Sequence, residues 1–189
     1  MDNQQPGIRR LIQRLDQDTA LSDVEAICAA VKATLVQEIV DTNLELPAEF
    51  LAPVPGDYAR RLLHRHPDDR YAVVVMTWGC GQGTPIHDHA GKWCVECVYQ
   101  GRILVQSYEL LEDPKDREVV GFRKAKETHA GRGAAGSLIP PFDHHVIQNT
   151  DSDTAVTVHV YGGEMDGCEI FSPVEGDRYR RVWQQLSYT

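Results

Sequence analysis

The apolar residues of this chain change their spacing near residue 65. From residue 70 onward, short β-rich runs such as YAVVVMTW, CVECVYQG and TAVTVHVYG alternate with Gly, Pro, Asp and Asn. Turn signals at intervals of about ten residues leave no room for helices between the strands, which favours a β-sandwich or barrel over a sheet of alternating strands and helices. We therefore expect an all-β core over residues 66–189, ending in RYRRVWQQLSYT as a strand or a short helix.

Residues 1–65 have helical spacing instead. The first predicted helix has one apolar stripe, made of Ile8, Leu11, Ile12 and Leu15. A second helix is predicted to begin at a Ser22-x-x-Glu25 capping box. Its buried face is expected to hold Val24, Ile27, Cys28 and Val31. A chain of 189 residues suits one domain, so we expect residues 1–189 to form a single domain, with the helical region 1–65 packed on the barrel.

Charge and hydropathy exclude several classes of partner. The 28 acidic residues outnumber the 19 basic ones, for a net charge of −9, and the basic residues are scattered, so we expect no nucleic-acid partner. The N-terminus has no continuous apolar region of the kind a secretory signal needs, and the longest apolar run is too short to cross a bilayer. These features predict a cytoplasmic protein without membrane contact, and no pattern indicates an obligate protein partner.

The five cysteines are an odd number, which argues against a disulfide framework. Cys94 and Cys97 have C-x-x-C spacing, but on a strand an odd separation points the two thiols to opposite faces. A redox pair or a zinc site is therefore disfavoured. We expect Cys28, Cys80 and Cys97 to be small buried fillers.

Two histidines form the strongest candidate for a metal site. His87 and His89 are two residues apart, so on a strand their side chains share a face and can reach one ion together. Without a third ligand from another strand, the same pair would be an ordinary hydrogen-bonded or surface pair. The candidates for that third ligand are His144, His145 and His159.

The glycines that flank this pair complete a longer motif. GQGTPIHDHAGKWCVECVYQG has the form G-x5-H-x-H-x4-C-x6-G, from Gly81 to Gly101. It is similar to the first motif of the cupin superfamily, whose double-stranded β-helix, or jelly-roll, barrels hold a metal among histidines. Cys94 stands where ordinary cupins have a glutamate ligand.

A second segment, PPFDHHVIQN, resembles part of the second cupin motif, P-x4-H-x3-N. Pro140, His145 and Asn149 match it, whereas Phe142 replaces the usual glycine. The resemblance implies a cupin barrel with N-terminal helices, and a metal bound by His87, His89 and His145. Three neutral imidazoles leave the full 2+ charge on the metal, which suits an anionic thiolate together with dioxygen.

Three histidine ligands, a TWG strand and a downstream HxY resemble the thiol dioxygenases of the cysteine dioxygenase family from about residue 58 to 171. This resemblance implies Fe(2+) as the cofactor, and a small thiol and O2 as the substrates. The implied substrate contacts are Tyr58 and Arg60, with Arg60 binding the substrate carboxylate. The implied catalytic relay consists of Thr157, His159 and Tyr161. Arg60 and Trp93 resemble an Arg-type bacterial member.

Cys94 lies where animal members carry the cysteine that forms a thioether with the catalytic tyrosine, here Tyr161. The reaction implied is oxidation of L-cysteine to cysteine sulfinate. One alternative is a sister enzyme that acts on 3-mercaptopropionate or another carboxylated thiol, a branch associated with Gln in place of Arg60. Another, from a different class, is a non-redox cupin with zinc or nickel, either an isomerase or a ligand-binding module. No G-x-G-x-x-G motif for a nicotinamide or flavin is present.

Overall fold

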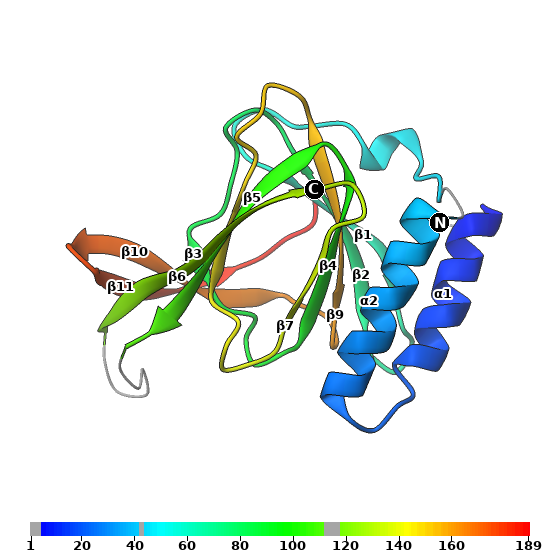
Figure 1. The fold of residues 1–189 in the computed structure, drawn as a ribbon, viewed down its shortest axis with the longest axis horizontal. Helices are drawn as coiled ribbons and strands as arrows, with labels where there is room; N and C mark the ends of the chain where they lie inside the picture. Colours follow the sequence, from blue (N-terminus) through cyan, green and yellow to red (C-terminus); the bar gives the residue numbers. More distant parts are fainter. Residues whose placement is uncertain (1–4, 42–43, 112–117) are drawn as a thin grey trace.

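The computed structural model describes residues 5–41, 44–111 and 118–189 (Figure 1). Its helices are α1 (Pro6–Asp18), α2 (Val24–Val40) and the short 3-10 helix η1 (Ala48–Phe50). The strands are β1 (Ala59–Arg65), β2 (Ala72–Trp78), β3 (Ile86–His87), β4 (Cys94–Gln100), β5 (Arg102–Leu110), β6 (Val119–Gly131), β7 (Ala135–Leu138), β8 (His145–Gln148), β9 (Ala155–Tyr161), β10 (Gly167–Glu175) and β11 (Arg178–Gln185). The turn between β5 and β6, predicted as part of a polar hairpin, falls on residues 112–117, outside the described residues.

The strands form two antiparallel sheets. One has the order β1-β2-β9-β4-β7, and the strands β10-β11-β6-β5-β8-β3 form a closed ring. Apolar side chains from both sheets meet in one cluster inside the barrel, for example Val74 and Met76 from β2 and Ile103 from β5. This arrangement is a cupin jelly roll, which confirms the predicted fold class.

Both helices cover the outer face of the first sheet, beside β1, β2, β4 and β9 (Figure 1). Alternate residues of β2 point to opposite faces of the sheet. Val73 and Val75 pack with the helices, whereas Val74 and Met76 face the barrel interior. Every residue of β2 and β9 is buried. The sheet is thus covered on both faces, which explains why these two strands are buried along their whole length and carry mostly apolar side chains.

The second helix begins differently from the prediction. Asp23, not Ser22, is the N-cap, and its carboxylate accepts a hydrogen bond from the backbone N–H of Ala26. Val24 is then the first helical residue and lies 40% exposed, so its predicted place on the buried face was wrong. The predicted stripe otherwise holds, since Ile27, Cys28 and Val31 are buried. An N-cap carboxylate satisfies the same orphan N–H groups as a serine, so either residue could have capped the helix.

The helical region was predicted to extend to residue 65, and this end is too far along the chain. β1 begins at Ala59 and pairs along its length with β2, so the strands start six residues before residue 65. The polar sequence ARRLLHR hid this strand, because an edge strand needs no continuous apolar run. The C-terminal segment forms the strand β11, and among the described helices none is long and apolar enough to cross a membrane.

The cysteines divide between two environments. Cys28 and Cys97 are buried in the cluster beneath the helices, and Cys94 is buried inside the barrel, which confirms the opposite orientation of Cys94 and Cys97. Cys80 is exposed, contrary to the prediction, because it lies in the turn that follows β2.

The backbone conformation explains why glycine stands at both ends of the first motif. Gly81 and Gly101 adopt φ angles of +76° and +74°, a region that residues with a Cβ avoid. At Gly101 a Cβ would also lie only 2.9 Å from backbone atoms of Thr154 and Ala155. These two turns therefore set where the segment between them, with both histidines, enters and leaves the barrel.

Candidate metal centre and substrate pocket

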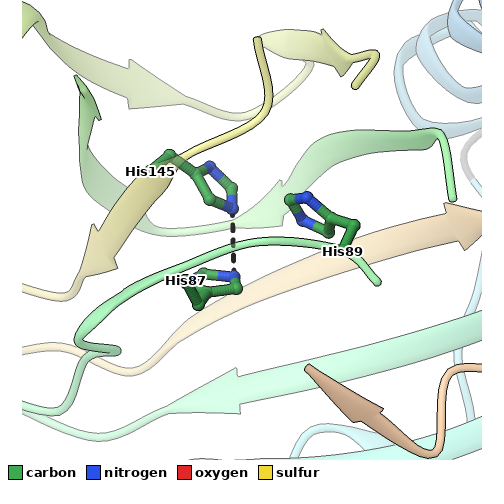
Figure 2. Close-up of side chains that lie close together, drawn as sticks. All are labelled: His87, His89 and His145. Carbon is green, nitrogen blue, oxygen red and sulfur yellow. Dashed lines mark hydrogen bonds between the residues drawn. The ribbon is translucent and has the colours of Figure 1, made fainter. Parts of the chain in front are cut away.

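The histidines His87, His89 and His145 lie together in the barrel, with one ring nitrogen of each within 4.8 Å of the others (Figure 2). The pairing of β3 with β8 places His145 directly opposite His87. β3 ends at His87, so His89 lies in the following loop rather than on the same strand as predicted. The three side chains converge because a strand, a loop and a second strand meet at one point.

Neighbouring oxygen atoms orient two of the rings. Nδ1 of His87 lies 3.1 Å from the carbonyl oxygen of Pro85, and Nδ1 of His89 lies 3.2 Å from Oδ2 of the buried Asp143. Both oxygens can only accept, so we assign the proton of each ring to Nδ1 and leave Nε2 as a lone pair. Such hydrogen bonds from the outer nitrogen are the usual support of metal-binding histidines.

Burial keeps the rings of His87 and His145 neutral. It lowers the pKa of His87 to about 3, helped by the neighbouring His89, and lowers the pKa of His145 well below its usual value. Neutral imidazole is the form that binds metals. Nε2 of His145 lies only 3.2 Å from Nε2 of His87, a close approach of two ring nitrogens that one cation could bridge. The donor set therefore fits a divalent transition metal, and an all-nitrogen set does not favour Mg²⁺ or Ca²⁺.

A cavity of about 210 Å³ opens beside the histidines. Its walls include His87, His145 and Tyr161 together with Tyr58 and Arg60, so the structure brings the predicted substrate contacts to the same space as two of the predicted ligands. Tyr58 stacks on Trp78 with ring centroids 4.6 Å apart, and burial raises the pKa of Tyr58 to about 12. The small volume suits a substrate of few atoms.

Arg60 is a buried cation at the wall of this cavity, 4% exposed. Its Nη2 donates to the carbonyl oxygen of Met165 at 2.5 Å, and its guanidinium lies 4.6 Å from the ring centroid of Tyr188. Nε of Arg60 is buried without a hydrogen-bond partner among the described residues. An unused donor on a buried guanidinium is suited to an anionic ligand.

The side chains of Thr157, His159 and Tyr161 all point into the barrel from β9, as their equal parity requires. Nε1 of Trp78 donates to the Thr157 hydroxyl at 2.9 Å, and that hydroxyl lies 2.7 Å from Nε2 of His159. The hydrogen-bonded series therefore begins at Trp78, a residue to which the sequence assigned no role in the relay. His159 contacts Tyr161 through parallel rings with centroids 5.9 Å apart.

Cys94 lies directly opposite Tyr161 in the pairing of β4 with β9. Its sulfur lies 4.0 Å from Nδ1 of His159, and burial raises the pKa of the Cys94 thiol well above its usual value, so the thiol is neutral. Cys168 lines the substrate cavity, and burial raises its pKa to about 12.

Two carboxyl groups of the site were not predicted from the sequence. Asp143 supports His89, and no pattern in the sequence indicated it. Glu96 lies 6% exposed beside His145 and His159, and burial raises its pKa to about 8. The sequence could have indicated Glu96, because it is a charged residue in a buried strand and lies two residues after Cys94, on the same face of that strand. His144, given no role, packs between the rings of Phe122 and Phe171.

A jelly-roll barrel with three convergent imidazoles defines the class: a cupin with a metal-binding centre. More particularly, the model of the family "Cysteine dioxygenase type I" matches residues 17–174, so the chain belongs to this family and is an oxidoreductase of the dioxygenase class. Cysteine dioxygenase type 1 of Bos taurus is 24% identical over 151 residues, covering 78% of this chain and 73% of that protein. The Homo sapiens protein of the same name is 25% identical over 147 residues, covering 76% and 71%.

Two solved structures are similar at lower sequence identity. The protein TT1209 from Thermus thermophilus superposes with a TM-score of 0.47 at 18% identity, covering 63% of this chain and 96% of that one. A Klebsiella pneumoniae protein with a double-stranded β-helix domain has the same TM-score and identity, covering 65% and 92%.

Proposed function

We propose that this chain is an Arg-type, iron(II)-dependent thiol dioxygenase that converts L-cysteine and O2 into cysteine sulfinate. The observation that carries the proposal is the position of Arg60, a buried cation on the wall of the same small cavity as His87 and His145. A thiol at the metal and a carboxylate at Arg60 would both lie in this one cavity. Membership of the cysteine dioxygenase type I family favours this reading over a non-redox cupin.

Arg60 fixes how the substrate lies. Its Nη2 is already bonded to the Met165 carbonyl, so the guanidinium is held in place before the substrate arrives. A carboxylate that reaches the unused Nε of Arg60 would form a charge-assisted hydrogen bond in a site with little water. The other end of a small amino acid thiol then points toward the histidines.

The reaction balances without a further cofactor. Both atoms of O2 end on sulfur, and oxidation of the thiolate to the sulfinate supplies all four electrons. Iron(II) held by His87, His89 and His145 would supply the one-electron chemistry that lets O2 react with a thiolate. The protein side chains bind and orient: Thr157 holds His159, His159 packs against Tyr161, and Tyr161 presents its hydroxyl to the cavity.

The proposal also includes the cellular compartment and the domain organisation of the enzyme. We place it in the cytoplasm as one cupin domain over residues 1–189, because its thiols fit a reducing compartment. A small thiol and O2 are the only partners that this chemistry requires.

Metal analysis and oxygen consumption test the proposal together. The purified protein is expected to contain iron, and His87→Ala, His89→Ala and His145→Ala are each expected to lose the metal and the activity. His144→Ala is the matched control, because this adjacent histidine packs against Phe122 and Phe171 and should leave iron binding intact.

A panel of cysteine, 3-mercaptopropionate and cysteamine then identifies the substrate. Oxygen uptake that is fastest with cysteine supports the proposal, and a preference for 3-mercaptopropionate would favour the sister enzyme. Full iron occupancy in His145→Ala would overturn the ligand assignment. Zinc or nickel in place of iron, without oxygen uptake, would favour the non-redox cupin.

A further inference from the structure

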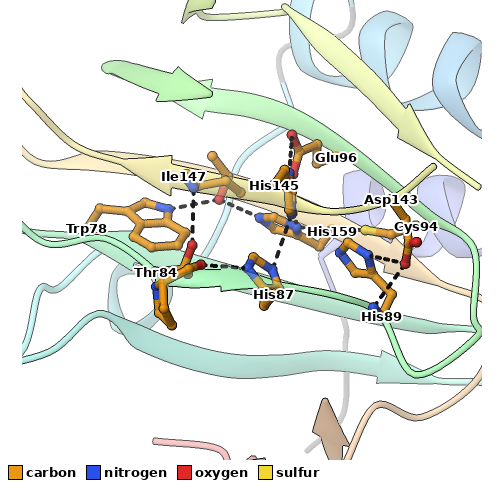
Figure 3. A network of polar contacts seen from close by, with 12 residues as sticks. Trp78, Thr84, His87, His89, Cys94, Glu96, Asp143, His145, Ile147 and His159 are labelled. Carbon is orange, nitrogen blue, oxygen red and sulfur yellow. Dashed lines mark hydrogen bonds and ion pairs between the residues drawn. The ribbon is translucent and has the colours of Figure 1, made fainter. Parts of the chain in front are cut away.

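The carboxyl group of Glu96 lies between two buried histidines inside the barrel (Figure 3). Its Oε1 is 3.9 Å from Nδ1 of His145, and its Oε2 is 3.7 Å from Nδ1 of His159. Glu96 reaches both because it projects inward from β4, the strand that pairs with β9, where it lies directly opposite His159. One side chain thus contacts both a proposed metal ligand and a member of the Thr157–His159 pair.

The Nδ1 atoms of the two rings lie near this carboxyl. Because the Thr157 hydroxyl accepts from Trp78, we assign its own proton to Nε2 of His159, which leaves the ring proton of His159 on Nδ1. Once Nε2 of His145 faces a metal, the proton of that neutral ring also lies on Nδ1. The separations of 3.7 and 3.9 Å are longer than hydrogen bonds, and Nδ1 of His145 and Oε2 of Glu96 are both buried without a hydrogen-bond partner among the described residues.

We propose that Glu96 is a positioning residue that holds His145 and His159 in their working tautomers through one shared carboxyl group. The inference rests on the proposed metal site, since the tautomer of His145 follows from metal binding at Nε2. A divalent metal at His145 would favour the ionised form of Glu96, and a carboxylate on the outer nitrogen fixes the orientation of a metal-binding histidine and makes it a stronger ligand. Glu96 does so for His145 and, through its second oxygen, ties that ligand to the hydrogen bonds of His159 and Thr157.

A second cavity makes this role testable by chemical rescue. It has a volume of about 290 Å³, and its walls include Glu96 and Thr157 together with small or apolar residues such as Ala135 and Val105. On this side Glu96 faces Gly136, where an added Cβ would lie 3.7 Å from Oε1. Truncating Glu96 to alanine would therefore extend the cavity to the two Nδ1 atoms, and a small carboxylate could occupy the space.

The experiment measures the affinity of the full-length protein for Fe(II) under anaerobic conditions, and for Co(II) as a spectroscopic probe. Glu96→Ala should weaken binding by about 10- to 100-fold, the range typical for loss of such a partner. Acetate should restore affinity in Glu96→Ala, whereas acetamide, which has the same shape without the charge, should not. Val105→Ala enlarges the same cavity without contacting a histidine and is expected to bind metal like the wild type and to show no response to acetate.

Glu96→Gln gives the second, isosteric test. Its amide oxygen can accept from one ring, but its NH2 group then faces the N–H of the other, so metal affinity should fall although the volume is unchanged. The metal-free variants should unfold at the same temperature as the metal-free wild type or higher, because they remove a buried carboxyl that has an unpaired oxygen. A purely structural role would instead lower the unfolding temperature.

Wild-type metal affinity in both Glu96→Ala and Glu96→Gln would overturn the inference, as would equal rescue by acetate and acetamide. These outcomes are separate from failure of the proposed function, in which the wild-type protein itself would bind no iron or oxidise no thiol.

Discussion

Replacing Arg60 with glutamine is the sharpest test of substrate recognition. Glutamine keeps much of the length and polarity of the side chain but removes the positive charge that faces the cavity. The loss is expected in binding of the substrate carboxylate, because Arg60 is 4% exposed and water cannot take its place. His87 lies on β3, His89 on the loop after it and His145 on β8, so the substitution in β1 should leave the metal in place.

The expected size of the effect follows from the burial of this cation. Removing one partner of a desolvated, hydrogen-bonded charge pair costs about 2–5 kcal/mol, and each 1.4 kcal/mol corresponds to a factor of ten. The value of kcat/KM for cysteine should therefore fall by roughly 30- to 3,000-fold. An exposed ion pair would give about 0–1 kcal/mol, so even the lower limit separates a buried clamp from a surface charge.

The assay compares kcat/KM for cysteine, 3-mercaptopropionate and cysteamine by oxygen consumption, with iron content measured in each sample. Arg60→Gln should lose most activity on cysteine and relatively less on 3-mercaptopropionate, which lacks the amine. Arg61→Gln is the matched control, because the neighbouring Arg61 bonds instead to Thr77 and to the Ala52 carbonyl. It should leave the preference among the three thiols unchanged.

The activity of the wild-type protein on cysteamine can refute the role of Arg60. Cysteamine has no carboxylate and should be a poor substrate if Arg60 binds that group. Oxidation of cysteamine as fast as cysteine by the wild type would show that Arg60 does not recognise the substrate.

Three further predictions concern the cross-link, the core and the exposed thiol. Coupling of the Cys94 sulfur to the Tyr161 ring, with O2 as the oxidant, should lower the intact mass by about 2 Da after turnover. The shift should vanish in Cys94→Gly and Tyr161→Phe but persist in Cys97→Ser, and an unchanged mass in an active, iron-loaded sample would make Cys94 a packing residue. Leu35→Ala removes a fully buried side chain of α2 from the cluster between the helices and the first sheet, and should lower the free energy of unfolding by about 2–5 kcal/mol in urea titrations, whereas a loss near zero would mean that the helices contribute little. Cys80 should be the first thiol alkylated in the native protein, and faster labelling of a buried cysteine would contradict the packing described above.

The sequence predicted the β-rich core, and which residues of its strands share a face, because these signals are local. Runs such as YAVVVMTW carry strand propensity in themselves, and the equal parity of Thr157, His159 and Tyr161 follows from the geometry of any strand. The errors also have local causes. Ser22 and Asp23 are both good caps, so adjacent residues competed for one position, and the arginines of β1 concealed an edge strand.

Composition and spacing by themselves predicted an all-β sandwich or barrel after two helices, and predicted that His87 and His89 lie near each other. Only the tertiary structure decided which residues meet them, because the register of β3 against β8 selects His145, and the pairing of β4 with β9 sets Glu96 opposite His159. Asp143 reaches His89 across 54 positions of sequence. Contacts of this kind arise when distant strands pair, and no short stretch of sequence encodes them, since each strand carries only its own half of the contact.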